Sequence, residues 1–225
     1  MRTLILTGSD DEMLSVLDLT LPSKQAYCKR HNYDLLSLRS FPADKECNFE
    51  SRHIGFIRVA TAFKLLKFYD NVMWVDADSI ITNTDYKIED FITGTETFIA
   101  SYDWMWYNSF SSGNFIVRRT PDAQQLFNRF LAVSRYRLND IMQDQGALNQ
   151  IFNESVEYRK MFNVLHHRFL GSVPALMVDT ITWRNDNNRS GIINQWNPDC
   201  FLAHLTGATA SDRIDILTNN KLNLK

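Results

Sequence analysis

The stretch of sequence that decides the fold is Val72-Met73-Trp74-Val75-Asp76-Ala77-Asp78. Its first four residues form a continuous apolar run between Asn71 and Asp76, which is typical of a central parallel strand covered on both faces. In open α/β sheets, ligands bind beyond the carboxyl ends of such strands. The two aspartates therefore lie where the sequence predicts a ligand.

Strands and helices are predicted to alternate on both sides of this stretch. The apolar pattern predicts further strands at residues 3–7, 34–38, 98–102 and 114–117. Helical spacing predicts helices over residues 22–31 and 55–69, one capped by Thr120 with Pro121 at its first position, and one beginning at Asp144. No period persists after about residue 162. This order favours one α/β domain with a mostly parallel sheet and an appended, partly antiparallel region.

The composition excludes several classes of protein. The 225 residues hold 24 Lys and Arg against 26 Asp and Glu, so the chain lacks the positive charge that nucleic-acid binding needs. No apolar run approaches the roughly 20 residues of a membrane helix, and no secretory signal follows Met1. The three cysteines show neither metal-ligand spacing nor a disulfide framework. We therefore expect a soluble, cytoplasmic protein, or a piece of a longer one, with no nucleic-acid partner and no membrane span.

The aspartate pair suits a divalent cation. Carboxylate oxygens favour Mg²⁺ or Mn²⁺, and such ions commonly bridge to substrate phosphates. We expect one aspartate to hold the metal, while the other takes a ribose hydroxyl or orients a metal-bound water. The structural alternative is a solvated loop with two acidic residues.

Two other features accompany the pair: a helix that begins near Arg58 before it, and the segment His204-Leu205-Thr206-Gly207 after it. The combination resembles the GT-A nucleotide-sugar glycosyltransferases, especially the galactosyl- and mannosyl-transferase group of fungal Golgi enzymes and plant xyloglucan xylosyltransferases. In size and style it is also similar to the glycosyltransferases of chlorella-infecting viruses. The resemblance implies a single GT-A domain over residues 1–225, with a Rossmann-like, mostly parallel sheet flanked by helices. Residues 1–118 would bind the nucleotide sugar, and 119–225 would form a smaller, irregular or antiparallel acceptor side and supply a metal ligand.

The resemblance also implies a cofactor and a donor. Asp78 and His204 would ligate Mn²⁺ or Mg²⁺ on the diphosphate of a nucleotide sugar, with a UDP-sugar favoured, and Asp76 would face the ribose or a metal-bound water. Gly207 would let backbone N–H groups approach the diphosphate. The structural alternative for His204 is a buried, hydrogen-bonded core histidine.

Further site residues follow from the same resemblance. Nucleotide or sugar contacts are implied for Thr7, Gly8, Ser9, Arg58, Ala77, Gly113, Asn114 and Gln145. The catalytic candidates are Asp144 and Asp103, and the neighbouring Trp104, Trp106 and Tyr107 would stack on the acceptor sugar. Strand-ending turns, a helix N-cap at Asp144 and core packing of the aromatic residues are the structural alternatives.

The sequence therefore predicts a metal-dependent, retaining glycosyltransferase. It would move a hexose or deoxyhexose from a nucleoside-diphosphate sugar to an oligosaccharide or glycoprotein acceptor. Two alternatives stay open: a metal-dependent phosphohydrolase or nucleotidyltransferase, which could use the same aspartates, and a non-catalytic carbohydrate-binding module, which would need only the aromatic loop.

Overall fold

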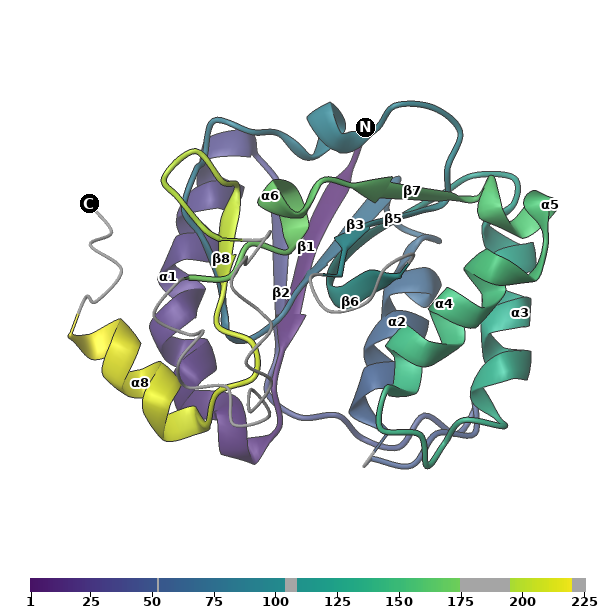
Figure 1. Ribbon diagram of the computed structural model, residues 1–225, viewed down its shortest axis with the longest axis horizontal. Coiled ribbons are helices and arrows are strands. Elements are labelled where there is room, and N and C mark those ends of the chain that lie inside the picture. The colour runs from purple at the N-terminus through teal and green to yellow at the C-terminus, as the bar shows by residue number, and fades with distance from the viewer. Residues whose placement is uncertain (52, 104–108, 175–194, 220–225) are drawn as a thin grey trace, which may run out of the picture.

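A six-stranded sheet forms the centre of the computed structural model, which describes residues 1–51, 53–103, 109–174 and 195–219 (Figure 1). The strand order is β2-β1-β3-β6-β5-β7. The strands are β1 (Thr3–Gly8), β2 (Asp34–Leu38), β3 (Asn71–Val75), β5 (Phe98–Tyr102), β6 (Phe110–Arg118) and β7 (Phe162–Leu165). Only β6 runs against its neighbours, so the sheet is mostly parallel, as the sequence predicts.

A second, two-stranded sheet lies beside the first. Its strands β4 (Ser79–Ile81) and β8 (Leu202–His204) are antiparallel, and Ser79 is opposite His204. This small sheet confirms the predicted antiparallel region. It also joins the segment after β3 to the late part of the chain.

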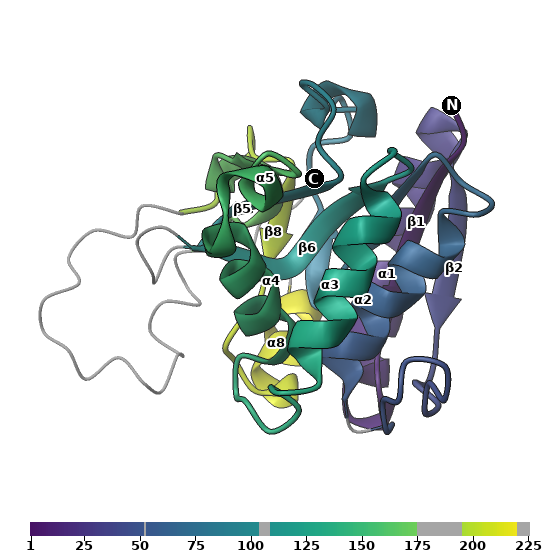
Figure 2. The same ribbon diagram turned by 90° about the vertical axis from the view of Figure 1, so that its right-hand side faces the viewer.

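Helices cover both faces of the central sheet (Figures 1 and 2). One side carries α1 (Leu14–His31) and α8 (Ala210–Thr218), and the other carries α2 (Ile54–Leu65), α3 (Ala123–Ser134) and α4 (Gln143–Glu154). The short elements are η1 (Asp11–Met13), η2 (Ile88–Phe91), α5 (Val156–Arg159) and α6 (His167–Leu170). Among the described residues, no helix combines the length and the apolar character that crossing a bilayer requires.

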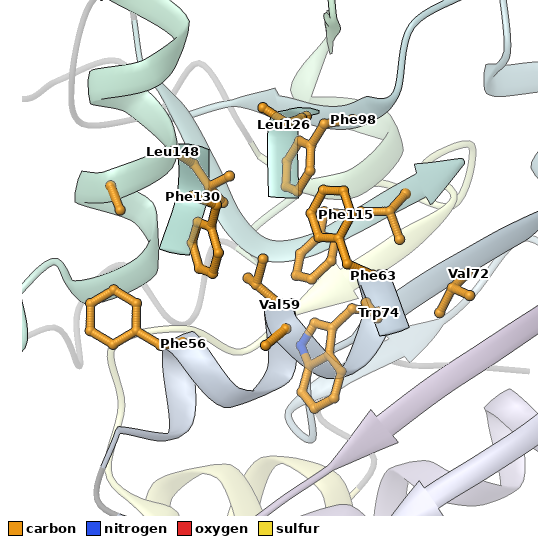
Figure 3. Close-up of a cluster of buried hydrophobic side chains, with 14 of the residues drawn as sticks. Phe56, Val59, Phe63, Val72, Trp74, Phe98, Phe115, Leu126, Phe130 and Leu148 are labelled. Atoms are coloured by element: carbon orange, nitrogen blue, oxygen red, sulfur yellow. The ribbon is translucent and has the colours of Figure 1, made fainter. Parts of the chain in front are cut away.

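The core explains why the strand before the aspartates is apolar throughout. Successive side chains of a strand point to opposite faces of the sheet. Val72 and Trp74 accordingly pack into the cluster under α2, α3 and α4, drawn in Figure 3, whereas Met73 and Val75 pack into the cluster on the α1 side. Both faces of β3 are buried, which explains the continuous apolar run from Val72 to Val75.

Several predicted boundaries are wrong. The first helix begins at Leu14 rather than near Pro22, which lies inside it. An interior proline removes a hydrogen bond, but the buried face that begins at Val16 and Leu17 holds the earlier turns against the sheet. The helix predicted to start at Thr120 and Pro121 begins at Ala123, whose amide donates to the carbonyl of Thr120 in a preceding turn.

Other elements differ in length or pairing. The helix predicted over 55–69 ends at Leu65, the strand predicted at 114–117 extends over Phe110–Arg118, and the helix predicted from Asp144 starts at Gln143. The strand at 72–75 is parallel to β1 on one side only, because β6 pairs with it in the antiparallel sense. A continuous apolar run reports burial on both faces, which an antiparallel neighbour also allows.

Candidate active site

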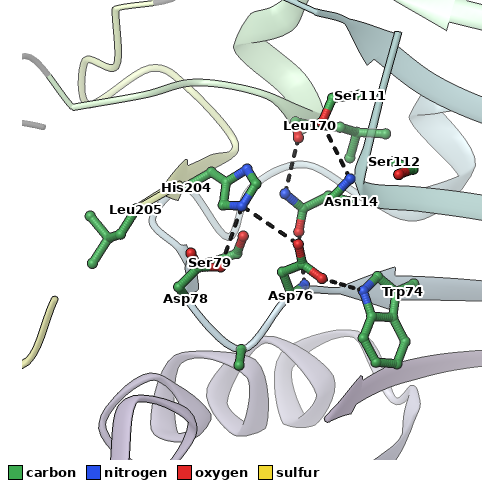
Figure 4. Close-up of polar contacts among 12 residues, drawn as sticks. Trp74, Asp76, Asp78, Ser79, Ser111, Ser112, Asn114, Leu170, His204 and Leu205 are labelled. Carbon is green, nitrogen blue, oxygen red and sulfur yellow. Dashed lines mark hydrogen bonds and ion pairs between the residues drawn. The ribbon is translucent and has the colours of Figure 1, made fainter. Parts of the chain in front are cut away.

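The Asp76–Ser79 turn leaves the end of β3 and leads directly into β4 (Figure 4). The amide of Ser79 donates to the carbonyl of Asp76 at 3.0 Å, and the amide of Leu205 donates to the carbonyl of Asp78 at 3.0 Å. Because Ser79 is also opposite His204 in the small sheet, the late histidine lies against the turn. The fold thus brings His204 to the two aspartates.

Asp76, Asp78 and His204 point toward one another (Figure 4). The Nε2 atom of His204 lies 3.3 Å from Oδ1 of Asp78 and 3.6 Å from Oδ2 of Asp76. One potential ligand atom from each residue falls within 4.8 Å of the others. Two carboxylate oxygens and one imidazole nitrogen at this spacing fit a divalent cation such as Mn²⁺ or Mg²⁺.

The electrostatics of the cluster also fit a cation. Burial raises the pKa of Asp76 above its ordinary value. Burial acts in the same direction on Asp78, but His204 and Arg213 outweigh it and lower its pKa well below the usual range. Burial tends to lower the pKa of His204, but Asp78 outweighs it and raises that pKa. The carboxylates thus stabilise positive charge at the imidazole, and a bound cation would supply that charge in place of the proton.

Arg58, on α2, links the cluster to a third aspartate. Its Nη1 donates to Oδ1 of Asp76 at 2.5 Å, and its Nη2 donates to Oδ2 of Asp144 at 3.0 Å. Nη2 also lies 3.2 Å from the hydroxyl of Ser112. Trp74 completes this side, because its indole N–H donates to Oδ1 of Asp76 at 2.6 Å. The guanidinium therefore fixes two carboxylates from different elements.

Asp103, one of the catalytic candidates, is held by Gln145, the residue that follows the other candidate, Asp144, on α4. The Nε2 atom of Gln145 donates to Oδ2 of Asp103 at 2.6 Å, and its Oε1 accepts the amide of Ser112 at 3.3 Å. Asp144 lies in the first turn of α4, is 3% exposed and makes no helix cap, since Met142 precedes the helix. The structure thus places Asp103 against Gln145, which lines the same pocket as Asp144. The aromatic residues Trp104, Trp106 and Tyr107 lie outside the described residues.

Two pockets lie on either side of Arg58, which lines both. The first, about 210 Å³, lies between the end of β1 and the aspartate turn, and its lining includes Gly8, Ser9, Asp76, Ala77, Asp78 and Arg213. The second, about 330 Å³, includes Gly55, Ser112, Met142, Asp144 and Gln145. Most of the residues predicted to bind the nucleotide sugar therefore line one of two adjacent pockets.

At the end of β1, two hydroxyl groups have no hydrogen-bond partner among the described residues. Thr7 is 0% exposed and Ser9 is 4% exposed, yet neither hydroxyl has a hydrogen-bond partner within the described ranges. Buried polar groups are nearly always paired, by protein, water or a ligand. Ser9 lines the first pocket, so a bound ligand could satisfy its hydroxyl group.

Asn114 and Gly113 support the cluster from β6. The Oδ1 atom of Asn114 accepts the amide of Asp76 at 3.1 Å, and its Nδ2 donates to the carbonyl of Leu170 at 3.1 Å. Asn114 is 0% exposed, so its amide holds the aspartate turn in place. Gly113 lies against the His204 ring. A Cβ atom at position 113 would lie 2.4 Å from Cε1 of His204 and 3.0 Å from Oδ2 of Asp76.

Replacing Gly113 by alanine should therefore displace the ring of His204. The cluster fits Mn²⁺, and we expect Gly113→Ala to lower its affinity for added Mn²⁺ by about 10- to 100-fold, the usual effect of disturbing the surroundings of a metal ligand. Electron paramagnetic resonance of free Mn²⁺ measures this affinity. The matched control is Gly94→Ala, whose Cβ would approach no atom of the cluster and would meet only a carboxylate oxygen of Glu96, at 3.1 Å. The double variant Gly113→Ala/His204→Ala should bind Mn²⁺ almost as strongly as His204→Ala alone, because the ring that the new Cβ displaces is already absent. Wild-type Mn²⁺ affinity in Gly113→Ala would refute the contact between residue 113 and the His204 ring.

The predicted contact of Gly207 with a diphosphate stays a prediction, and Arg213 adds a residue to the site. Gly207 is exposed, has a φ of 79° and lines neither pocket around Arg58. Arg213, which the sequence analysis missed, donates to Oδ2 of Asp78 at 2.9 Å and to the carbonyl of Leu205 at 2.8 Å. The signal that could have found it is the Thr209–Asp212 capping box, which opens α8 one turn before. Trp74 and Ser112 were likewise not predicted to make polar contacts.

The fold is similar to those of solved glycosyltransferases. A glycosyltransferase involved in glycosylation of the major capsid of PBCV-1 is 16% identical, with 97% of this chain and 100% of that chain covered and a TM-score of 0.65. The galactosyltransferase LgtC, solved with donor and acceptor sugar analogs, is 15% identical, with 96% and 95% covered and a TM-score of 0.56. The glycosyltransferase GlyE of Streptococcus pneumoniae TIGR4 is 12% identical, with 99% and 64% covered and a TM-score of 0.60. The GT-A fold is thus confirmed, as is the resemblance to a chlorella-virus enzyme at the level of fold.

The comparisons of sequence give a family. No curated protein matches the chain. A family described as "Protein of unknown function, DUF273" matches residues 24–167, which include β3, Asp76, Asp78 and Asp144. That match covers more than half of the 225 residues, and the chain belongs to this family.

Proposed function

We propose that this protein is a metal-dependent glycosyltransferase that uses a nucleoside-diphosphate sugar. The observation that carries the proposal is the meeting of Asp76, Asp78 and His204 beside a pocket at the carboxyl ends of β1 and β3. Ligands of open α/β sheets bind at such ends. These three residues lie together in a GT-A fold, which favours this function over a phosphohydrolase, a nucleotidyltransferase or a carbohydrate-binding module.

The first pocket has the chemistry that a nucleoside diphosphate requires. Its apolar wall includes Met13, Phe41 and Ile54, which suit a base, and the unpartnered hydroxyl of Ser9 suits a ribose or base polar group. Asp76 and Asp78 of the metal cluster line the same pocket, as do their partners Arg58 and Arg213. A divalent cation held there would neutralise charge on the diphosphate as it leaves. We propose a uridine nucleotide as the donor, with Mn²⁺ or Mg²⁺ as the ion.

The second pocket is proposed to take the transferred sugar and the acceptor hydroxyl. Asp144 and Gln145 line it, and Asp103 is held by Gln145. Asp144 already accepts hydrogen bonds from Arg58 at 3.0 and 3.2 Å, and Asp103 accepts one from Gln145. We therefore propose that these carboxylates hold sugar hydroxyl groups and that transfer retains the anomeric configuration, since retention needs no carboxylate base on the opposite face of the sugar.

Nucleotide binding tests this function directly. We expect UDP or a UDP-sugar to raise the unfolding temperature in the presence of Mn²⁺ but not in EDTA, because a ligand that binds only the native state stabilises it. At about 100 times its Kd, the ligand adds about 2.7 kcal/mol to the free energy of unfolding. A thermal-shift panel of UDP, GDP and their sugars, each with Mn²⁺ and with EDTA, measures the effect. No stabilisation by any of them would refute the proposed function.

A further inference from the structure

A buried lysine lies beneath the aspartate turn, outside the site described so far. Lys24, on α1, is 0% exposed. Its Nζ donates to the carbonyl of Ser79 at 2.7 Å and to the hydroxyl of Thr20 at 2.8 Å. Lys24 lines neither of the pockets on the two sides of Arg58. Its ammonium group is therefore directed at the backbone of the turn rather than at a ligand.

Two neighbours on the same helix extend this contact. The hydroxyl of Thr20 donates to the carbonyl of Ala77 at 2.5 Å, and the hydroxyl oxygen of Ser23 accepts the amide of Ile81 at 3.3 Å. We call Thr20, Ser23 and Lys24 the α1 clamp. The clamp contacts the backbone of Ala77, which lies in the turn, and of Ser79 and Ile81, which are alternate residues of β4.

The α1 clamp restricts the backbone conformation of Asp78. In an antiparallel ladder, the polar backbone groups of alternate residues point to the same edge of a strand. Strand β8, which carries His204, pairs with β4 along one edge, and the α1 clamp holds the backbone groups on the other. Asp78 lies between the two clamped carbonyls of Ala77 and Ser79. Its backbone is therefore fixed from both directions.

A merely space-filling role would not need an ammonium group here. Burying a charged group costs free energy that an apolar side chain of the same length would not. Burial lowers the pKa of Lys24 to about 7, against the opposing effects of Asp78 and Asp76. The ammonium group thus lies within electrostatic reach of both aspartates. What it supplies at this cost is one hydrogen bond to the carbonyl of Ser79 and one to Thr20, whose own hydroxyl donates to the turn at Ala77.

We propose that Lys24, with Thr20 and Ser23, is a positioning residue that holds the Asp76–Ser79 turn in the conformation where both aspartates face His204. The proposal rests on the proposed function in one respect, that these side chains bind a metal. It assigns to α1, which lies beside the small sheet in Figure 1, a direct part in shaping the metal site. Outer partners of this kind control the affinity of metal sites through the orientation of the ligands.

The first arm of the test needs no metal. Lys24→Met keeps the aliphatic stem and removes the ammonium group, Thr20→Val removes the hydroxyl without changing the shape, and Thr20→Ser keeps the hydroxyl as the matched control. Hydrogen exchange is followed at the amides of Ser79 and Leu205, which donate to Asp76 and Asp78. We expect exchange at least about tenfold faster in Lys24→Met and Thr20→Val, with the amides of residues 72–75 in β3 unchanged as the internal reference. Thr20→Ser should exchange as the wild type does.

The second arm measures Mn²⁺ affinity in the same proteins. We expect affinity about 10- to 100-fold weaker in Lys24→Met and Thr20→Val, and wild-type affinity in Thr20→Ser. A wild type that binds no Mn²⁺ would refute the proposed function and, with it, the metal-positioning role. Unchanged exchange at Ser79 and Leu205, or β3 exchange accelerated equally, would overturn the α1 clamp itself. Faster exchange at the turn with unchanged Mn²⁺ affinity would overturn its role in positioning the metal ligands.

Discussion

The variant Asp78→Asn should lose Mn²⁺-dependent transfer by at least about a thousandfold. An amide has the shape of the carboxylate but not its charge, so the proposed cation would lose a charged ligand while the guanidinium of Arg213 would lose its ion-pair partner. Stabilising the charge of a departing diphosphate by a metal is worth several kcal/mol, and each 1.36 kcal/mol is about tenfold in rate. Release of UDP from a UDP-sugar, with and without acceptor, measures the loss.

A matched control separates this effect from a general one. Asp11→Asn changes the same chemical group on η1, where the side chain is exposed and contacts neither pocket, and should keep the wild-type rate. Circular dichroism should show that both variants are folded. A rate for Asp78→Asn within tenfold of the wild type would contradict the assignment of this carboxylate as a metal ligand. Glycan binding that survives in Asp78→Asn, together with no nucleotide binding by the wild type, would point to the carbohydrate-binding alternative.

The largest loss of stability is expected for Arg58→Met. The side chains of Asp76 and Asp144 are only 20% and 5% exposed, and both ion-pair with Arg58. Removing one partner of a buried ion pair leaves an uncompensated charge and costs about 3–5 kcal/mol of the free energy of unfolding. Arg58→Lys should lose less, because an ammonium group keeps the charge but cannot reach two carboxylates with a planar fork. Urea unfolding at pH 7 measures both variants.

The control for Arg58 is an ion pair at the surface. Arg39 donates to both carboxylate oxygens of Asp18, but the two side chains are 56% and 50% exposed. Arg39→Met should therefore cost less than about 1 kcal/mol, since water screens exposed charges. Equal losses in Arg58→Met and Arg39→Met would show that the buried network contributes no more than a surface pair, which would contradict the account of Arg58.

The position of the two aspartates at the end of a buried strand could be predicted because the pattern that indicates it lies within a few consecutive residues. An apolar strand that ends in two carboxylates is legible in seven residues, and the structure confirms that strand as buried on both faces. The role of His204 as a metal ligand was predicted only from the family resemblance. Its contact with the turn depends on β4 and β8, three-residue strands far apart in the chain, which are too short for a period to be visible.

Lys24 and Arg213 show why the rest could not be predicted. A lysine on an amphipathic helix is ordinarily a solvated residue, and only the packing of α1 against β4 reveals that Lys24 is 0% exposed. Arg213 lies on a helix that the sequence analysis did not predict, although Thr209 and Asp212 form a capping box at its start. Pro22 led to a wrong start for the first helix, which was predicted near Pro22 but begins at Leu14. Tertiary packing here outweighs the local preference of proline for a first turn.

The measurement that tests the central claim most directly is an anomalous diffraction map of crystals soaked with Mn²⁺ and UDP, recorded at the manganese absorption edge. The account predicts one strong peak bounded by the carboxylates of Asp76 and Asp78 and by Nε2 of His204, with the diphosphate in the pocket beside Ser9 and Arg213. Nucleotide density in that pocket without a manganese peak among these three residues, or a peak elsewhere on the protein, would contradict it.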